Sequence, residues 1–321
     1  MLASNTINRE QIDEIYAQMI VTAPSATLIK ELYTRMLLTR IVDDGAWRMH
    51  AQGYIDFATS CRGHEAAQVG SAICIEVGKD FTLPYYRDLG VMLTIGMTPY
   101  EVFRTYLQTH CPKTTQDDAQ KSPAMLHWGY HKHNTVTVPA PTATQILHAA
   151  GIAFACKLRK APIVTVAYCS DGTTVEADFQ EGIRFSAQHQ LPVIFICEQD
   201  CTQNTTNSSS MQNRELPPGL TYQHIDGSDI IAVYTAMQRA TQHARSGQGP
   251  VLLEMSVTRL ASSLQAQKEN EETNAVRNDP LIRCQRYLHE QGLWDEVWAN
   301  DLYTRLATEV EQAMQDALRD N

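Results

Sequence analysis

The amino-acid sequence predicts an α/β fold in which a doubly wound, mostly parallel sheet is flanked by helices. Two observations predict it. Apolar, β-branched runs at 163–168 and 193–197 alternate with segments of helical periodicity, and each run ends abruptly in polar residues. The length of 321 residues and the lack of an internal repeat favour a single domain, 1–321, with helical extensions at 1–60 and 280–321.

Helices dominate the predicted amino-terminal part. Ser25 or Thr27 caps a long helix whose apolar residues recur at helical spacing, and Gly53 closes it. The elements expected next are a small-residue helix within 61–78, a turn at 83–90, a helix at 97–110, a polar surface loop at 111–124 and a short strand at 135–138 that ends at a proline. In that turn, Arg87 and Tyr86 can offer a guanidinium fork and a hydroxyl to a phosphate.

The carboxyl-terminal half continues the alternation. A helix is expected at 142–157, and the oxygen atoms of Thr144 and Gln145 in its first turn could enclose a cation or a ligand, or simply cap the helix. The elements expected after 197 are a polar loop at 202–219, a strand from 221 that turns at 226–227, an amphipathic helix at 230–245, a buried strand at 251–260, a mobile polar loop at 261–279 and helices from 280 onward.

The composition excludes several classes of function. The formal net charge of −10 and the isoelectric point near 5.5 argue against a nucleic-acid or anionic-membrane surface. No apolar stretch approaches the roughly 20 residues that a membrane-spanning helix needs, and the first residues lack the layout of a signal peptide. We therefore expect a cytoplasmic protein whose partners are small molecules or other protein chains, with no nucleic acid and no membrane.

The cysteines and histidines do not form a recognisable metal motif. The eight cysteines never occur in C-x-x-C spacing, and several lie in apolar runs, so that neither disulfides nor a structural zinc site are expected. His131 and His133 form an H-x-H pair, but no third ligand lies near them in the sequence.

The strongest candidate site lies at the carboxyl ends of the two central runs. Asp171 follows the first run and Asp200 follows the second, so that the carboxylates are expected side by side where parallel sheets bind ligands. Mg²⁺ takes one or two carboxylates and completes its octahedron with phosphate oxygens and water. The alternative is that both acids only cap the helices that follow.

Several motifs carry a resemblance to a known family. They are CRGHEAAQVG, LPYYRDLGVMLTIGM, HWGYHKHN, PTATQ, DFQEGIRFSAQHQLPVIFICE and HIDGSDIIAVYTA. In this order and spacing they resemble the alpha subunit of the thiamine-diphosphate-dependent decarboxylase component of the 2-oxo acid dehydrogenase complexes, closest to the branched-chain type. The resemblance covers nearly the whole chain and implies the thiamine-diphosphate-binding fold, with this chain as its diphosphate-binding half.

The resemblance assigns roles to particular residues. Asp171, Asp200 and the main-chain carbonyl of Thr202 match the magnesium ligands. The positions that match contacts to the cofactor are Tyr86 and Arg87 for its diphosphate, Ala140 and Thr142 for its aminopyrimidine, and Ser170, Gly172 and Thr173 around Asp171. Thr144 and Gln145 match a potassium site of the branched-chain members.

The resemblance also implies partners and a reaction. The cofactor's thiazolium ring takes up the electrons released when a 2-oxo acid loses carbon dioxide, and the acyl or aldehyde unit passes to an acceptor such as a lipoyl acyltransferase. The Glu that activates the aminopyrimidine belongs to a separate beta subunit, and the site forms within an α2β2 assembly. The resemblance therefore implies that this chain is inactive alone.

Four departures from the family pattern concern this activity. Ser170 replaces the first Gly of the G-[DE]-G triplet, and Gln199-Asp200 replaces an N-N pair, which adds a carboxylate beside an anionic diphosphate. Thr202 replaces an aromatic residue. Ser263 stands about where the family carries a catalytic His, and no His occurs between His243 and His289.

Three hypotheses follow from the residues. The first is a divergent thiamine-diphosphate enzyme that works with a beta subunit. The second is a catalytically impaired pseudo-subunit that keeps the fold in order to assemble with or regulate a beta subunit. The third is an unrelated metal- or nucleotide-binding α/β protein, which the absence of a G-x-G-x-x-G or phosphate-loop pattern disfavours.

Overall fold

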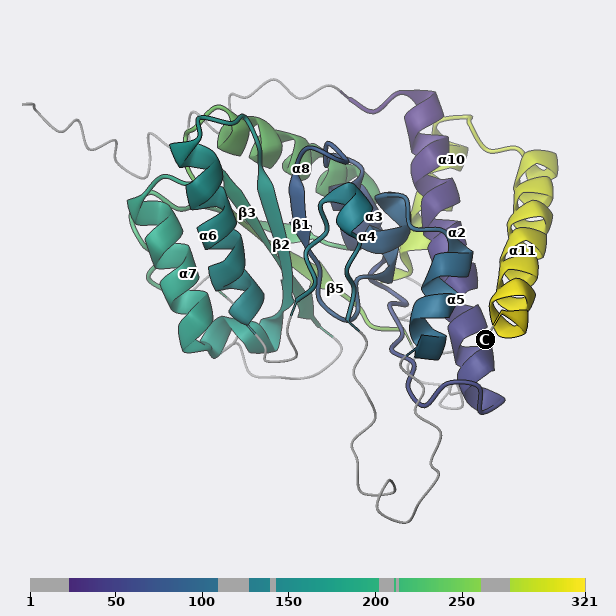
Figure 1. The fold of residues 1–321 in the computed structure, drawn as a ribbon. Helices are drawn as coiled ribbons and strands as arrows, with labels where there is room; N and C mark the ends of the chain where they lie inside the picture. The colour runs from purple at the N-terminus through teal and green to yellow at the C-terminus, as the bar shows by residue number, and fades with distance from the viewer. Residues whose placement is uncertain are drawn as a thin grey trace, which may run out of the picture.

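Five parallel strands form a single sheet at the centre of the molecule (Figure 1). The computed structural model describes residues 23–108, 127–138, 143–201, 211, 214–260 and 278–320. The strands are β1 (Phe81–Leu83), β2 (Thr165–Ser170), β3 (Val193–Asp200), β4 (Thr221–Asp226) and β5 (Val251–Val257). They pair in the order β1-β2-β3-β5-β4, and every pair is parallel. This sheet, with helices on both faces, confirms the predicted α/β fold class.

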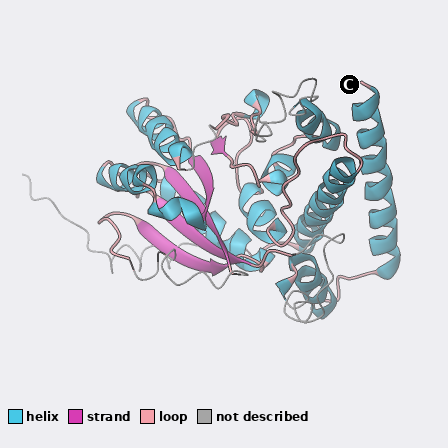
Figure 2. Cartoon of the chain, turned by 90° about the horizontal axis from the view of Figure 1, so that it is seen from below, coloured by secondary structure: helices cyan, strands magenta, loops and turns pink. Residues whose placement is uncertain are grey.

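Helices cover both faces of the sheet (Figure 2). They are α2 (Ala26–Ala51), α3 (Glu65–Ala72), α4 (Leu89–Thr94), α5 (Pro99–Gln108), α6 (Thr144–Leu158), α7 (Ala177–Gln188), α8 (Ile230–Arg245), α10 (Pro280–Glu290) and α11 (Glu296–Arg319), with 3-10 turns η2 (His131–His133) and η3 (Asp171–Val175). Residues of α6 and α7 share one apolar core with the sheet, whereas α3, α4, α5 and α8 share another.

The alternation of side chains along β2 explains why its sequence is apolar throughout. Val166 and Tyr168 enter the core on the α3 and α8 face, while Ala167 and Cys169 enter the core on the α6 and α7 face. All four are at most 1% exposed. Gly182 of α7 lets α7 approach α6 closely, because a Cβ there would lie 2.7 Å from a methyl of α6. The central βαβ unit is thereby held rigidly on both faces.

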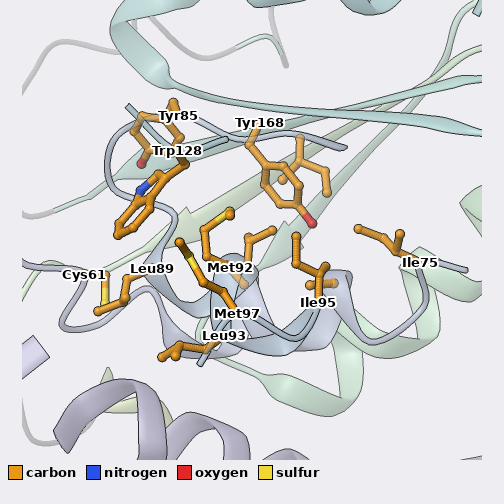
Figure 3. Packing of buried hydrophobic residues seen from close by; sticks show 14 of the residues in the cluster. Cys61, Ile75, Tyr85, Leu89, Met92, Leu93, Ile95, Met97, Trp128 and Tyr168 are labelled. Atoms are coloured by element: carbon orange, nitrogen blue, oxygen red, sulfur yellow. The ribbon is translucent and has the colours of Figure 1, made fainter. Parts of the chain in front are cut away.

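The core on the α3 and α8 face contains most of the large side chains (Figure 3). Tyr168 extends from β2 toward Met92 and Ile95, and Trp128 lies beside Tyr85. Trp128 is fully buried and donates its indole N–H to the carbonyl of Tyr86 at 3.1 Å. This packing fixes the turn that contains Tyr86 and Arg87 against the sheet.

The first described helix, α2, packs against the carboxyl-terminal helices α10 and α11. Ser25 is the residue that caps α2, since its hydroxyl accepts from the backbone N–H of Leu28 at 3.2 Å. The Tyr33 ring on α2 contacts the rings of Trp294 and Trp298, with centroids 5.3 and 5.8 Å apart. The aromatic residues of the carboxyl-terminal part therefore anchor α11 to α2.

Some elements differ from the prediction. The strand expected at 135–138 is wrong: Thr135 forms only isolated bridges to Thr82 and Tyr130. The β-branched residues at 135–138 lie beside the three-residue strand β1, which was not predicted, and α4 was not predicted either. Several boundaries also shift: α3 is shorter than expected, β2 lies two residues later, β3 extends to Asp200, α5 begins at Pro99 and β5 ends at Val257. The predicted loop at 111–124 and residues 261–277 of the loop predicted at 261–279 lie outside the described residues.

None of the helices within the described ranges is both long and apolar enough to cross a membrane. The seven cysteines within these ranges are free thiols, and five of them are buried. They act there as small apolar side chains in the cores.

His243 on α8 makes stability depend on pH. It is 1% exposed, its Nε2 lies 3.3 Å from the Thr221 hydroxyl, and burial lowers its pKa from 6.5 to about 4. Between these two values the unfolded chain binds a proton that the folded chain does not, so the free energy of unfolding falls as the pH drops from 6.5 toward 4, by about 3 kcal/mol in all. Urea unfolding across this range should show that His243→Gln removes this part of the slope.

His148 on α6 supplies the matched control, because it is an exposed histidine. The variant His148→Gln should keep the wild-type dependence of stability on pH. Parallel curves for the wild type and His243→Gln would contradict the account of His243.

Candidate active site

Two carboxylates meet at the carboxyl edge of the sheet, as predicted. Asp171 is the first residue after β2, and Asp200 is the last residue of the neighbouring strand β3. Burial raises the pKa of Asp171, and the negative charge of Asp200 raises it further, which indicates that the two groups are electrostatically close. Asp171 does not cap α7: its carboxylate accepts from the backbone N–H of its neighbour Gly172 at 2.9 Å, and Glu176 is the cap residue.

A cation from the next strand joins the acid pair. Arg259 lies just beyond β5, whose Val257 stands opposite Asp200 in the sheet register. Its Nε lies 3.3 Å from Asp200 Oδ2, and its charge also lowers the pKa of Asp171. Three neighbouring strand ends thus bring together two acids and one arginine. No sequence motif pointed to Arg259, although a buried acid such as Asp200 requires a positive partner.

The backbone around Asp171 leaves room for a ligand. Ser170 has φ −97° and ψ 168°, an extended conformation that any residue adopts, so the serine causes no backbone strain there. A Cβ on Gly172 would meet no atom within 4 Å, which shows open space beside the acid. Thr173 is buried within η3. Gln199 precedes Asp200 in β3, and its side chain therefore points to the opposite face of the strand.

The turn with Tyr86 and Arg87 is held from three sides. Arg87 donates to the carbonyl of Ser60 at 2.6 Å, and its guanidinium lies 5.4 Å from the centre of the Tyr86 ring. Gln68 of α3 donates to the Arg87 carbonyl at 3.1 Å. Both predicted diphosphate contacts remain half-exposed. Their guanidinium and hydroxyl can therefore still meet an anion.

A buried polar network connects this turn to β3. His64 Nδ1 lies 2.6 Å from Glu198 Oε2, and the Tyr85 hydroxyl donates to the same oxygen at 2.9 Å. Gln68 reaches this oxygen at 3.3 Å while it also holds the Arg87 carbonyl. His64 and Glu198 are 2% and 1% exposed. Because Glu198 lies two residues before Asp200, the network couples the position of the arginine turn to that of the acid pair.

The segment before α3 carries His64 to the strand ends. Gly63 has φ +90°, and a Cβ there would lie 1.9 Å from the carbonyl oxygen of Thr258, so only glycine fits. The backbone N–H of Leu260 donates to the Arg62 carbonyl at 3.2 Å on the same side. This stretch belongs to the motif CRGHEAAQVG, whose polar residues carried no predicted role. All eight residues of α3 are buried, and its Glu, Gln and Ser therefore need partners.

The candidate potassium residues lie near this edge. Thr144 donates its hydroxyl to Asp178 at 3.3 Å, and Gln145 donates its amide N–H to the carbonyl of Tyr168 in β2 at 3.2 Å. The side-chain oxygen of each residue keeps acceptor capacity. Four other predicted positions lie outside the described residues, namely Ala140, Thr142, Thr202 and Ser263.

The donors present fit a magnesium ion with a phosphate ligand. The structure shows no group of three or more His, Cys, Asp or Glu within the described ranges that could hold a metal by itself. Mg²⁺ does not need such a group, because one or two carboxylates suffice when phosphate oxygens and water supply the remaining positions. The acid pair meets this need, and Arg259 already provides a positive partner for it. His133, one histidine of the H-x-H pair, lies instead beside a backbone carbonyl: its Nδ1 is 2.5 Å from the carbonyl oxygen of Ile95.

A parallel sheet with acids, an open backbone turn and arginines at its carboxyl edge defines a class of α/β proteins that bind phosphate-bearing ligands. Within that class, the chain belongs to the dehydrogenase E1 component family, whose model matches residues 33–321. This membership confirms the family that the sequence motifs resemble.

Individual relatives agree with the family match. The chain is 34% identical over 302 residues to the 2-oxoisovalerate dehydrogenase subunit alpha of Bacillus subtilis (strain 168), which covers 90% of this chain and 86% of that protein. It is 31% identical over 311 residues to the 3-methyl-2-oxobutanoate dehydrogenase subunit alpha of Mycobacterium tuberculosis (strain ATCC 25618 / H37Rv), covering 92% and 80%. It is 27% identical over 333 residues to the pyruvate dehydrogenase E1 component subunit alpha of Staphylococcus aureus (strain Mu50 / ATCC 700699), covering 98% and 82%.

The network around Glu198 can be tested through stability. His64→Ala leaves a buried carboxylate with fewer partners and should lower the free energy of unfolding by about 1–3 kcal/mol. His64→Gln can still donate to Glu198 and should lose less than half as much. Denaturant unfolding of both variants measures the difference.

A suitable control is His131→Ala, which removes an exposed imidazole from η2 and should change the free energy of unfolding by less than about 0.5 kcal/mol. If His64→Ala proves as stable as the wild type, the claim that Glu198 couples the arginine turn to the acid pair is wrong.

Proposed function

We propose that this chain is the alpha subunit of a thiamine-diphosphate- and magnesium-dependent 2-oxo acid dehydrogenase. In this proposal the enzyme decarboxylates a 2-oxo acid and transfers the acyl or aldehyde unit, and the chain contributes the diphosphate half of the site. The observation that carries the proposal is the pair Asp171 and Asp200 at neighbouring strand ends, next to Arg259, in a member of the dehydrogenase E1 component family.

Each residue of the edge has a task in the proposed reaction. Asp171 and Asp200 would hold Mg²⁺, with the carbonyl of Thr202 as a third ligand, and Arg87 and Tyr86 would bind the diphosphate. Ser170, Gly172 and Thr173 would line the metal side, and Ala140 and Thr142 would line the aminopyrimidine. The bound cofactor supplies a ring that takes up the electrons released with carbon dioxide. The protein orients the cofactor through these contacts and the network beneath them.

The proposed assembly is heteromeric. Three relatives carry the designation alpha in their names, which supports a beta subunit as partner, in a cytoplasmic α2β2 enzyme that includes the catalytic Glu of the beta chain. Two of these names specify 2-oxoisovalerate or 3-methyl-2-oxobutanoate, and these two relatives are more similar to the chain than the pyruvate dehydrogenase subunit. A short branched-chain 2-oxo acid is therefore the substrate class that we favour, with a lipoyl acyltransferase as one acceptor.

A potassium ion is a further part of the proposal. Thr144 and Gln145 lie at the start of α6, and both keep side-chain oxygen atoms that can accept from or coordinate a cation. The side-chain amide of Gln145 donates a hydrogen bond to the carbonyl of Tyr168 in β2, two residues before Ser170. A cation there would stiffen the strand end that carries Asp171.

A second candidate function is a pseudo-subunit that assembles with or regulates a beta subunit. It is favoured by one observation, the absence of a histidine between His243 and His289, with Ser263 about where the family carries its catalytic one. Both candidates need the fold and the beta subunit. They differ in turnover.

Cofactor binding separates the proposal from an unrelated α/β function. Calorimetry on the assembly with its beta subunit should show thiamine diphosphate binding that requires Mg²⁺. Asp171→Asn should weaken this binding at least about tenfold, because it removes a ligand charge. The exposed Asp301→Asn on α11 is the matched control and should bind as the wild type does. Equal affinities for Asp171→Asn and the wild type would refute the assigned role.

Turnover separates the two candidates. The assembled enzyme should release carbon dioxide from a branched-chain 2-oxo acid, measured with an artificial electron acceptor so that no lipoyl acceptor is needed. A pseudo-subunit would bind the cofactor in the assembly and release none.

A further inference from the structure

We infer that Arg259 is an additional cofactor-binding residue that exchanges partners: its guanidinium pairs with Asp200 before the metal enters and binds the diphosphate afterwards. This inference deepens the proposed function and rests on it. It follows from the position of Arg259 just beyond β5, where its guanidinium pairs with Asp200.

The position of Arg259 is where a metal would compete with it. Its Nε lies 3.3 Å from Asp200 Oδ2, at the end of the strand that pairs with β2, and Asp171 directly follows β2. A divalent ion held by the same two carboxylates would contact the atoms that the guanidinium now faces. Arginine and metal cannot both occupy the closest approach to Asp200, because like charges at such a distance repel.

A purely structural role does not account for the pair. The Arg259 side chain is 40% exposed, and half-exposed ion pairs contribute little to stability. Asp200, in contrast, is only 9% exposed, and a buried carboxylate without a positive partner is costly. The pair therefore compensates an acid that the site needs, and does so with a cation on a flexible stem that can leave.

The charges of the filled site require a cation for the diphosphate. The two carboxylates carry two negative charges, which the two positive charges of Mg²⁺ offset. The negative charge of the diphosphate is then left to the arginines at the edge. Arg87 provides one guanidinium from the turn before α4, and Arg259, once displaced by the metal, provides another from the opposite side of Asp200. Its planar fork suits phosphate oxygens.

The exchange predicts opposite effects on two affinities. In Arg259→Gln, Mn²⁺ alone should bind about two- to fivefold more tightly, because no internal cation competes for the carboxylates. Thiamine diphosphate at saturating Mg²⁺ should bind about tenfold more weakly, because a charge-assisted contact is lost. Arg259→Lys keeps the charge and should leave Mn²⁺ affinity near that of the wild type while it weakens cofactor binding less.

The experiment is calorimetry on the assembly with its beta subunit, with Mn²⁺ alone and then thiamine diphosphate as titrants. Arg48→Gln is the matched control, since Arg48 is similarly exposed and pairs with Glu311 of α11, and it should change neither affinity. When Asp200→Asn is already present, adding Arg259→Gln should raise the Mn²⁺ affinity much less than Arg259→Gln does in the wild type.

The outcomes separate the inference about Arg259 from the proposed function. If Arg259→Gln weakens both affinities, or changes neither, while the wild type binds metal and cofactor, the inference about Arg259 is overturned and the proposed function stands. If the wild-type assembly binds neither, the proposed function fails and this inference fails with it.

Discussion

The site depends on one constraint, the parallel alignment of β2, β3 and β5. Because all three strands run in the same direction, their carboxyl ends meet at one edge of the sheet. The register then places Asp171, Asp200 and Arg259 on neighbouring strands, although they are far apart in the sequence. An antiparallel partner would remove one member from this edge. The apolar cores on both faces keep the alignment, since every residue of β2 except the last is buried.

The polar network beneath the edge links the turn that contains Arg87 to the end of β3. His64, Tyr85 and Gln68 all converge on Glu198 Oε2, and Gln68 also bonds to the carbonyl of Arg87. A change at this buried carboxylate is therefore felt both by the arginine turn and by the strand end. Precise placement of a cofactor needs such support, because side chains that contact the ligand are only as well ordered as the residues behind them.

Sequence patterns predicted the features that local chemistry determines. The alternation of apolar runs with helices indicated the sheet, the polar strand ends indicated the edge, and the Ser25 cap was one of two named candidates. Elements decided by distant contacts were missed. The β-branched residues from Thr135 predicted a strand, but it is the three residues of β1 that pair with β2. Likewise, the partner of Asp200 comes from another strand, and no local signal names Arg259. The acid pair itself offered the only hint, because it requires compensation.

The proposed magnesium site is tested most directly by asking whether a metal bound at this edge would touch the diphosphate. With Mn²⁺ supplied in place of Mg²⁺ to the assembly with the beta subunit, electron–nuclear double resonance would detect phosphorus atoms whose oxygens coordinate the metal. The account predicts a ³¹P hyperfine coupling with thiamine diphosphate bound, and its loss in Asp171→Asn. Bound cofactor without a ³¹P coupling, or a coupling that persists unchanged in Asp171→Asn, would contradict the account.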